Sequence, residues 1–271
     1  MGLSLEDNLA DIIGKAQRGL QISDSQLCAK AGLEMEALQQ LRDDHFAAEL
    51  VQKVAPVLGL NARALLAAGE KKWKPREVKL DGLAVFTTPF NDMQVNAYLV
   101  WLEETGDAVA FDTGADSGPL LDFLDKHKLS LKWILLTHTH GDHVFDLDRL
   151  KARTGAPAYV SSREPLEGAQ SIEENTEFEV GNLCIRSRLT WGHSQGGLTY
   201  LVQGLAKPVA VVGDALFAGS MGGGMVSYAD ALRTNREQIF TLPDETILCP
   251  GHGPMTTVGE EKMHNPFFAE G

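Results

Sequence analysis

The segment from Thr137 to His143 reads Thr-His-Thr-His-Gly-Asp-His and gathers three of the eight histidines of this 271-residue chain with one carboxylate. Imidazole and carboxylate are ligands that zinc, iron and manganese accept, and loop residues two apart can converge on one ion. His138 and His140 have that spacing, and Asp142 and His143 could hold a second ion. The alternative is a solvated polar loop, but so dense a histidine cluster favours a metal site.

Three later segments each place one ligand-type side chain among glycines and other small residues: His193, Asp214 and His252. Glycine beside a ligand lacks the Cβ that would block close approach of the backbone to an ion. Taken alone, His193 could be a core histidine and Asp214 could cap a helix. Together with the first cluster, they predict convergence on a common site. The remaining histidines have no such setting and are assigned no chemistry: His45, His127 and His264.

Short strands and helices are expected to position these residues. An apolar run at 133–136 predicts a buried strand that leads into the histidine cluster, and apolar spacing at 144–150 predicts a helix after it. A hairpin turn is expected at 104–107, and helices at 119–127 and 228–239. Further strands are expected at 78–80, 83–87, 95–102, 108–111, 157–160, 178–180, 183–189, 198–202 and 209–212. Two strand-rich halves with helices outside indicate a layered α/β sandwich with active residues at strand ends.

The first 72 residues have few strand formers and a helical apolar spacing instead. Gly32 separates two short helices by a tight turn, and the segment from Ile22 to Leu33 resembles the helix-turn-helix of the Cro/repressor-like family. That resemblance implies a DNA-reading helix at about residues 34–41. However, residues 1–72 carry eight Lys and Arg against ten Asp and Glu. Since duplex binding depends on phosphate neutralisation, a packing, dimerising or lid role is favoured over DNA binding.

A polar break around Pro75 predicts two domains, a helical domain over 1–72 and a catalytic domain over 73–271. Asp and Glu outnumber Lys and Arg by 37 to 24, a net charge of −13 that disfavours nucleic acid and anionic membranes as partners. The three cysteines, Cys28, Cys184 and Cys249, are widely spaced and read as reduced core residues. The first residues lack the features of a secretory signal, and no run approaches the roughly 18 apolar residues of a membrane span. We therefore expect a cytoplasmic protein.

The HxHxDH pattern and the downstream His, Asp and His positions together resemble the metallo-β-lactamase superfamily, from about Val78 to the C-terminus. The resemblance implies a four-layer αβ/βα sandwich with a dinuclear centre at one edge of its sheets. It implies two divalent ions, zinc first, with iron or manganese as alternatives. It also implies that Asp112, in Asp112-Thr113-Gly114, supports the ligand loop. The implied ligands are His138, His140 and His193 for the first ion, Asp142, His143 and His252 for the second, and Asp214 as the bridge.

Within that superfamily, residues 213–220, 250–254 and 264–267 look most like glyoxalase II, the hydroxyacylglutathione hydrolases. This similarity implies a small-molecule thioester or ester substrate, attacked by a hydroxide bridging two metals held in part by Asp142 and Asp214. The chain departs from that pattern after Ser220, where a glycine-rich run replaces the usual Gly-Arg, and it lacks the long C-terminal helical extension. Three alternatives remain: a mononuclear iron persulfide dioxygenase, a lactonase, or a ligand-sensing regulator that binds DNA.

Overall fold

The computed structural model describes residues 4–269. Five helices precede the first strand: α1 (Leu9–Gly19), α2 (Asp24–Ala31), α3 (Met35–Arg42), α4 (Ala48–Val57) and α5 (Ala62–Gly69). Local sequence explains where several of them begin. Asn8 and Asp11 form a capping box at the start of α1, and Ser23 and Gln26 form another at the start of α2. The predicted tight turn follows α2, where Gly32 adopts the left-handed conformation with φ of 62°.

The rest of the chain contains two six-stranded sheets. The first sheet runs in sequence order through β1 (Leu83–Phe90), β2 (Met93–Trp101), β3 (Asp107–Phe111), β4 (Ser130–Leu135), β5 (Ala158–Ser161) and β6 (Gln170–Ile172). The second has the order β12 (Thr256–Thr257), β11 (Ile247–Pro250), β10 (Val209–Gly213), β9 (Leu198–Gln203), β8 (Leu183–Leu189) and β7 (Glu177–Val180). The predicted hairpin between β2 and β3 and the antiparallel series from β7 to β9 are both confirmed.

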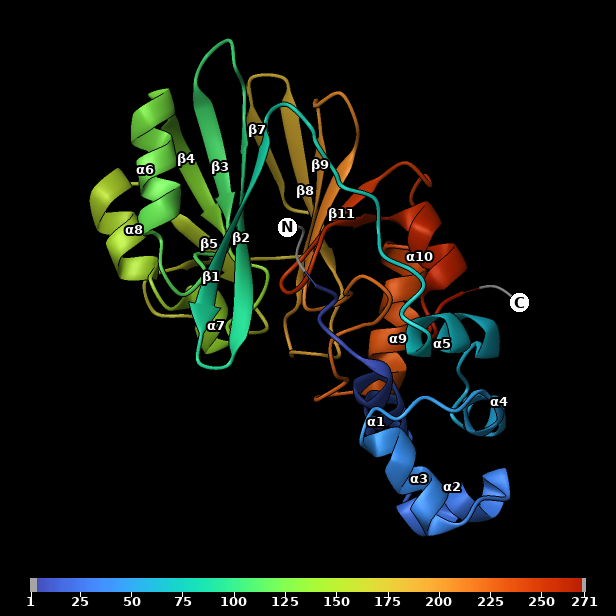
Figure 1. The fold of residues 1–271 in the computed structure, drawn as a ribbon. Helices are drawn as coiled ribbons and strands as arrows, with labels where there is room; N and C mark the ends of the chain where they lie inside the picture. Colours follow the sequence, from blue (N-terminus) through green and yellow to red (C-terminus); the bar gives the residue numbers. More distant parts are fainter. Residues whose placement is uncertain (1–3, 270–271) are drawn as a thin grey trace.

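The two sheets pack face to face with helices on both outer faces, as Figure 1 shows. Helices α6 (Gly118–His127) and α8 (Leu147–Thr154) cover the first sheet through one apolar cluster. Helices α9 (Tyr228–Gln238) and α10 (Val258–His264) lie on the outer side of the second. A further cluster, with Tyr98, Phe111 and Tyr200 almost fully buried, fills the space between the sheets. The predicted αβ/βα sandwich preceded by helices is confirmed.

Strand direction places the chemistry at one edge of this sandwich. β3 and β4 are parallel, as are β10 and β11, and β8 shares the direction of β10 because β9 is antiparallel to both. The carboxyl ends of β3 and β4 therefore meet at one edge of the first sheet, and those of β8, β10 and β11 at one edge of the second, where loops are free to carry functional side chains. The short helix α7 (Gly141–Val144) lies within one of these loops.

The N-terminal helices share a hydrophobic core with the sandwich. Leu9, Ile13 and Leu65 belong to the same buried cluster as Val212 and Leu248, which lie on the second sheet. The proposed division at residues 72 and 73 remains a prediction, but this packing makes the helices continuous with the sandwich core. None of the helices in residues 4–269 is long and apolar enough to cross a bilayer.

Two predicted elements differ in the structure. The segment 78–80 forms no strand; Val78 and Leu80 instead pack on the core between the sheets, and the chain turns into β1. The expected helix over 144–150 is split into α7 and α8, because Asp146 leaves helical geometry and its carboxylate accepts hydrogen bonds from the backbone and hydroxyl of Ser117. The sequence patterns also missed the short strands β6 and β12 and the helix α10.

Candidate metal centre

All seven predicted ligands lie together at the edge of the sandwich. They form two groups of neighbouring donor atoms: His138, His140, His193 and Asp214 in one, and Asp142, His143 and His252 in the other. Each comes from a loop that follows a strand: β4 for the first histidine cluster, β8 for His193, β10 for Asp214 and β11 for His252. Residues up to 114 positions apart in the chain thus meet in one cluster at the ends of these strands.

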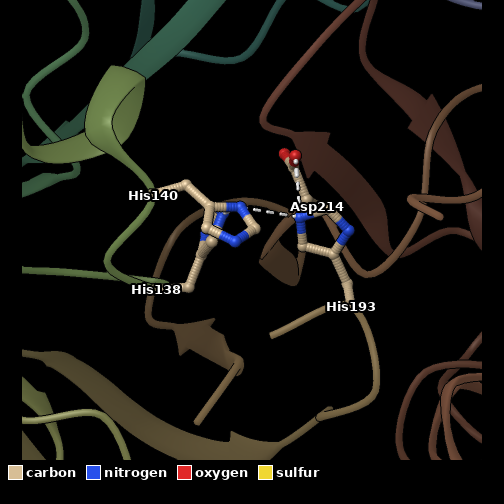
Figure 2. A group of neighbouring side chains, drawn as sticks. All are labelled: His138, His140, His193 and Asp214. Carbon is tan, nitrogen blue, oxygen red and sulfur yellow. Dashed lines mark hydrogen bonds and ion pairs between the residues drawn. The ribbon is translucent and has the colours of Figure 1, made fainter. Parts of the chain in front are cut away.

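Three imidazole rings converge in the first group (Figure 2). Nδ1 of His140 lies 3.0 Å from Nε2 of His138 and 3.0 Å from Nε2 of His193. Oδ2 of Asp214 lies 3.4 Å from Nε2 of His193. Four donor atoms that would share one cation therefore face a common point.

Asp214 also reaches the second group. Its Oδ1 lies 3.2 Å from Nε2 of His143, and its Oδ2 lies 3.5 Å from Nε2 of His252. Asp142 is 3.2 Å from Nε2 of His252 and 3.5 Å from Nε2 of His143. A single carboxylate thus stands between the two groups, which is the position the bridging assignment requires.

Hydrogen bonds to the opposite ring nitrogens fix which nitrogen each imidazole presents. Nδ1 of His193 lies 2.9 Å from the carbonyl of Gly223, and Nδ1 of His252 lies 2.6 Å from the carbonyl of Gln94. Because a carbonyl only accepts, each Nδ1 carries a proton, and Nε2 is the nitrogen that each ring presents to the cluster. Such partners set the orientation and basicity of metal-binding histidines.

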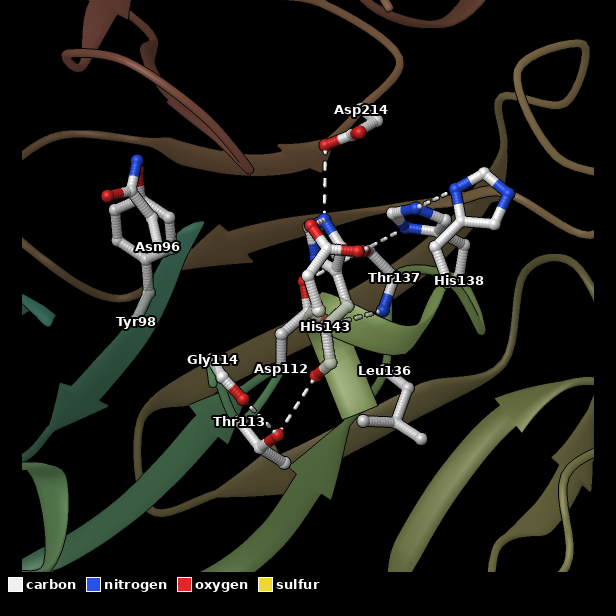
Figure 3. A network of polar contacts seen from close by, with 12 residues as sticks. Asn96, Tyr98, Asp112, Thr113, Gly114, Leu136, Thr137, His138, His143 and Asp214 are labelled. Carbon is white, nitrogen blue, oxygen red and sulfur yellow. Dashed lines mark hydrogen bonds and ion pairs between the residues drawn. The ribbon is translucent and has the colours of Figure 1, made fainter. Parts of the chain in front are cut away.

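Asp112 organises the base of the centre, as the resemblance implied (Figure 3). Its carboxylate accepts hydrogen bonds from the backbone and hydroxyl of Thr137, at 2.7 and 2.8 Å, and lies 2.8 Å from Nδ1 of His143. The Thr137 hydroxyl in turn lies 3.0 Å from Nδ1 of His138. Asp112 is only 2 % exposed and has a φ of 57°, so the chain accepts an uncommon conformation where this carboxylate is needed.

The cluster attracts positive charge. Burial opposes protonation of His143, yet Asp214 and Asp112 outweigh it and raise the pKa of His143 to about 10. Burial likewise opposes a charge on His252, but its bonds to Asp142 and Asp214 raise its pKa to about 11. Burial lowers the pKa of His138 well below its usual range. Without a metal, the protons on His143 and His252 therefore balance the negative charge of the carboxylates. A bound divalent ion would supply that positive charge instead.

The residues fit a metal centre by their donor chemistry. Nε2 of His143 and Oδ1 of Asp214 are buried atoms without a well-formed hydrogen bond among residues 4–269. Ligands about 2.0–2.1 Å from one zinc ion in a tetrahedral arrangement lie roughly 3.3 Å apart, close to the separations in the first group. Imidazole nitrogens and carboxylate oxygens suit zinc, iron and manganese alike, so the donor set does not select among them.

One supporting residue was missed by the sequence analysis. The half-buried Glu164 accepts hydrogen bonds from the backbone of Thr139, at 3.1 Å, and of Gly196, at 2.9 Å, as well as from the Thr139 hydroxyl. It therefore ties the loop of His138 and His140 to the loop of His193. No spacing rule pointed to Glu164, because its partners are mostly backbone amides of distant loops.

This fold and cluster define a class: a two-sheet αβ/βα sandwich with a His and Asp centre at the strand ends. Residues 90–252 match the model of the Metallo-beta-lactamase superfamily, and the chain belongs to that superfamily.

Several curated and solved proteins are similar to this chain. The probable metallo-hydrolase YqgX of Bacillus subtilis is 29% identical over 206 residues, which cover 66% of this chain and 95% of YqgX. The hydroxyacylglutathione hydrolase GloC of Haemophilus influenzae is 28% identical over 205 residues, with the same two coverages, 66% and 95%. The five N-terminal helices lie outside the residues that match the family model.

Three solved structures share the fold. The B3 metallo-beta-lactamase BLEG-1 has a TM-score of 0.59 at 29% identity and covers 68% of this chain and 99% of its own. ETHE1 from Myxococcus xanthus has a TM-score of 0.59 at 27% identity, covering 68% and 83%. TTHA1623, solved in a di-iron-bound form, has a TM-score of 0.56 at 28% identity, covering 68% and 100%.

Proposed function

We propose that this protein is a dinuclear metal-dependent hydrolase that cleaves a small-molecule thioester or ester. The observation that carries the proposal is the place of Asp214, whose two oxygens lie within 3.5 Å of imidazole nitrogens from both ligand groups. A carboxylate between two histidine groups is suited to hold two cations at once. The assignment gives His138, His140 and His193 to one cation, Asp142, His143 and His252 to the other, and Asp214 to both.

Two cations bound there would supply a water ionised near neutral pH and a Lewis acid for the substrate carbonyl. The chain's own residues hold the donor atoms in place: the carbonyls of Gly223 and Gln94 orient His193 and His252, and Asp112 orients His143. His138 and His143 are buried and shielded from solvent, while His193 keeps a partly exposed side chain.

The described cysteines do not provide a nucleophile of their own. Cys249 is fully buried, and burial raises the pKa of its thiol far above the usual value, so it stays protonated. Burial raises the pKa of Cys28 as well, and Cys28 lies in the N-terminal helices. Cys184 lies within β8 and Cys249 within β11, so we assign the attack to water rather than to a thiol.

The thioester preference draws on similarity to GloC, whose name describes hydrolysis of an acylated glutathione. Zinc is the first candidate metal, and the di-iron form of TTHA1623 keeps iron as the alternative. The test is a panel of purified, metal-loaded protein against a glutathione thioester, an acyl thioester without glutathione, a lactone, a β-lactam and a phosphodiester. We expect turnover of at least one thioester that is lost with a chelator and restored by metal. Chelator-sensitive turnover of the phosphodiester alone would contradict the proposal.

A second candidate is a persulfide dioxygenase, because the fold of ETHE1 is as similar to this chain as that of BLEG-1. That chemistry needs one iron held by two His and one Asp, so it would leave four of the seven side chains of the two donor groups without a ligand role. Oxygen uptake with a glutathione persulfide, together with one iron per chain, would favour this candidate over the hydrolase.

A further inference from the structure

The segment from Ser220 to Gly224 connects Asp214 to α9 and lies against the ligands on both sides. A Cβ on Gly222 would fall 1.8 Å from the carbonyl oxygen of Asp214 and 2.9 Å from Nδ1 of His193. The carbonyl of Gly223 accepts the hydrogen bond that orients His193. This glycine loop (residues 220–224) is therefore part of the wall of the metal centre.

The glycine loop has few contacts of its own: the backbone N–H of Met225 donates a hydrogen bond to the Gly223 carbonyl, at 2.8 Å. Residues 221–224 have no regular secondary structure, and three consecutive glycines have more conformational freedom than any other residues. An ordered loop of this composition needs contacts from outside to hold the Gly223 carbonyl in place.

Helix α1 and the residues before it provide such contacts. The Ser220 hydroxyl donates a hydrogen bond to Asp7, at 2.5 Å, and the Lys15 ammonium donates one to the carbonyl of Met221, at 2.9 Å. Lys15 and Asp7 also form an ion pair with each other, and their side chains are only 14% and 7% exposed. These partners are 206 and 213 positions apart in the chain.

Helix α1 and the segment that carries the glycine loop also pack against each other around these polar contacts. The Lys15 ammonium lies 4.7 Å from the ring centroid of Phe217, and that ring meets the ring of His252 edge to face at 5.5 Å. Met221 is buried in the cluster that contains the apolar face of α1. At the other end of α1, a Cβ on Gly19 would fall 2.2 Å from the ring of Tyr228, at the start of α9. Helix α1 thus contacts both ends of the segment that carries the glycine loop.

We propose that Asp7 and Lys15 are positioning residues of the metal centre, which act on His193 through the glycine loop. The N-terminal helices then complete the hydrolase site and do not form a detached module. The inference rests on the proposed function in one respect, since it takes His193 as a metal ligand. It assigns the N-terminal helices a role in the part of the chain that the superfamily match does not cover.

The test compares Lys15→Met, which keeps the length of the side chain but removes the ammonium, with Lys15→Arg, which can still donate to Met221. Lys30→Met is the matched control, because Lys30 is exposed on α2 and forms no ion pair within residues 4–269. Zinc affinity is measured by competition with a chromophoric chelator. Amide hydrogen exchange of residues 220–224 is measured in the metal-free protein.

We expect Lys15→Met to lose about 10-fold or more in zinc affinity, as for other residues that orient ligands, and to exchange faster in the glycine loop. Lys15→Arg should recover most of both properties, and Lys30→Met should match the wild type. Unchanged affinity and unchanged loop exchange in Lys15→Met would overturn the inference. So would faster exchange spread evenly over all of α1 to α5 with intact affinity, which indicates a purely structural role.

Should Lys15→Met fail to fold, Ser220→Ala serves in its place, because it removes only the hydrogen bond to Asp7. Loosening of the glycine loop and weaker zinc binding in Ser220→Ala would support the inference, and wild-type values would overturn it. Failure of the proposed function has a different signature, in which wild-type protein itself binds no zinc or hydrolyses no thioester.

Discussion

Asp214 is the residue on which the metal assignment depends most. It is 8% exposed, and its oxygens face nitrogens of three histidines. Burial raises its pKa, but His143 and His252 outweigh burial and hold the pKa far below the usual range. An ionised carboxylate in this place is costly unless cations compensate it. Substitution of Asp214 therefore tests the metal assignment directly.

Replacing Asp214 or His138 with Ala should remove metal and turnover together. Each change deletes a donor atom that no neighbour can replace, so the loss should exceed the 10- to 100-fold typical of outer partners, at about 100-fold or more in metal affinity. Metal content after gel filtration and chelator-sensitive hydrolysis are the measurements. His127→Ala is the control, since His127 stacks on Phe123 on the far side of the first sheet. Full activity in Asp214→Ala would refute the assignment.

Glu164 should prove a positioning residue of the same centre. Glu164→Ala leaves the backbone amides of Thr139 and Gly196 without their acceptor, so the two histidine loops should separate and metal affinity should fall by roughly 10- to 100-fold. Glu167→Ala is the matched control, because Glu167 is exposed on the same loop. Equal metal affinity in both variants, measured by chelator competition, would rule out this role for Glu164.

The ligands could be predicted from the sequence because their chemistry lies in residue type and spacing. The first cluster is recognisable because four ligand-type residues lie within six positions: His138, His140, Asp142 and His143. Neighbouring glycines distinguish His193 and His252 from other histidines. Glu164 could not be found this way, because a carboxylate that accepts from backbone amides leaves no pattern in the sequence of its partners.

At the scale of elements, the loop between β10 and α9 determines how closely Asp214 and His193 approach. Gly222→Ala should destabilise the fold by about 1–3 kcal/mol and weaken metal binding, because its Cβ would overlap the Asp214 carbonyl. Gly223→Ala is a close control, since its Cβ would meet only the flexible side chain of Met225, at 3.4 Å. Thermal unfolding and zinc titration of both variants are the measurements. Equally small losses of stability and of zinc affinity in the two variants would contradict the prediction.

Helix α10 contacts the same loop through a fully buried carboxylate. Glu261 accepts hydrogen bonds from the backbone of Gly219 and from Thr256 and Asn265, yet burial raises its pKa from 4.5 to about 7. A carboxyl with a raised folded-state pKa stabilises the fold below its unfolded pKa, and this contribution disappears as pH rises through the folded value.

The Glu261→Gln variant should therefore gain stability relative to the wild type as pH rises from 5 to 8. The measurement is the difference in melting temperature between the two proteins, taken with chelator present so that metal release does not contribute. Glu245→Gln, at an exposed position, should show no such trend. A difference that stays constant across this pH window would mean that Glu261 does not titrate there.

Elements with strong periodicity were predictable, and elements that exist only through tertiary contacts were not. β2 and α9 carry their pattern in their own residues. Strand β6 has three residues and β12 has two, so they are defined only by pairing with β5 and β11. Likewise, the break between α7 and α8 depends on the contact of Asp146 with Ser117, 29 positions away.

For the whole molecule, the sandwich was predictable from alternating strand and helix patterns. The position in which the N-terminal helices pack on the sandwich was not. A tight turn at Gly32 does separate α2 from α3, as the sequence predicted. Helix α3 carries Glu36 in its first turn, and its last residue, Arg42, is paired with Asp24. We therefore expect no shift of duplex DNA in a gel-shift titration at low salt. A complex that weakens steeply with added salt would instead support the regulator alternative.

The stoichiometry of bound metal tests the central claim most directly, because the account requires two cations among the seven side chains of the two donor groups. Elemental analysis of zinc-loaded wild-type protein after gel filtration should give about two metal ions per chain. The Asp214→Ala variant should retain fewer than the wild type, and His127→Ala should retain both. A wild-type chain that retains one metal ion or none, or an Asp214→Ala chain that retains as much as the wild type, would contradict the account.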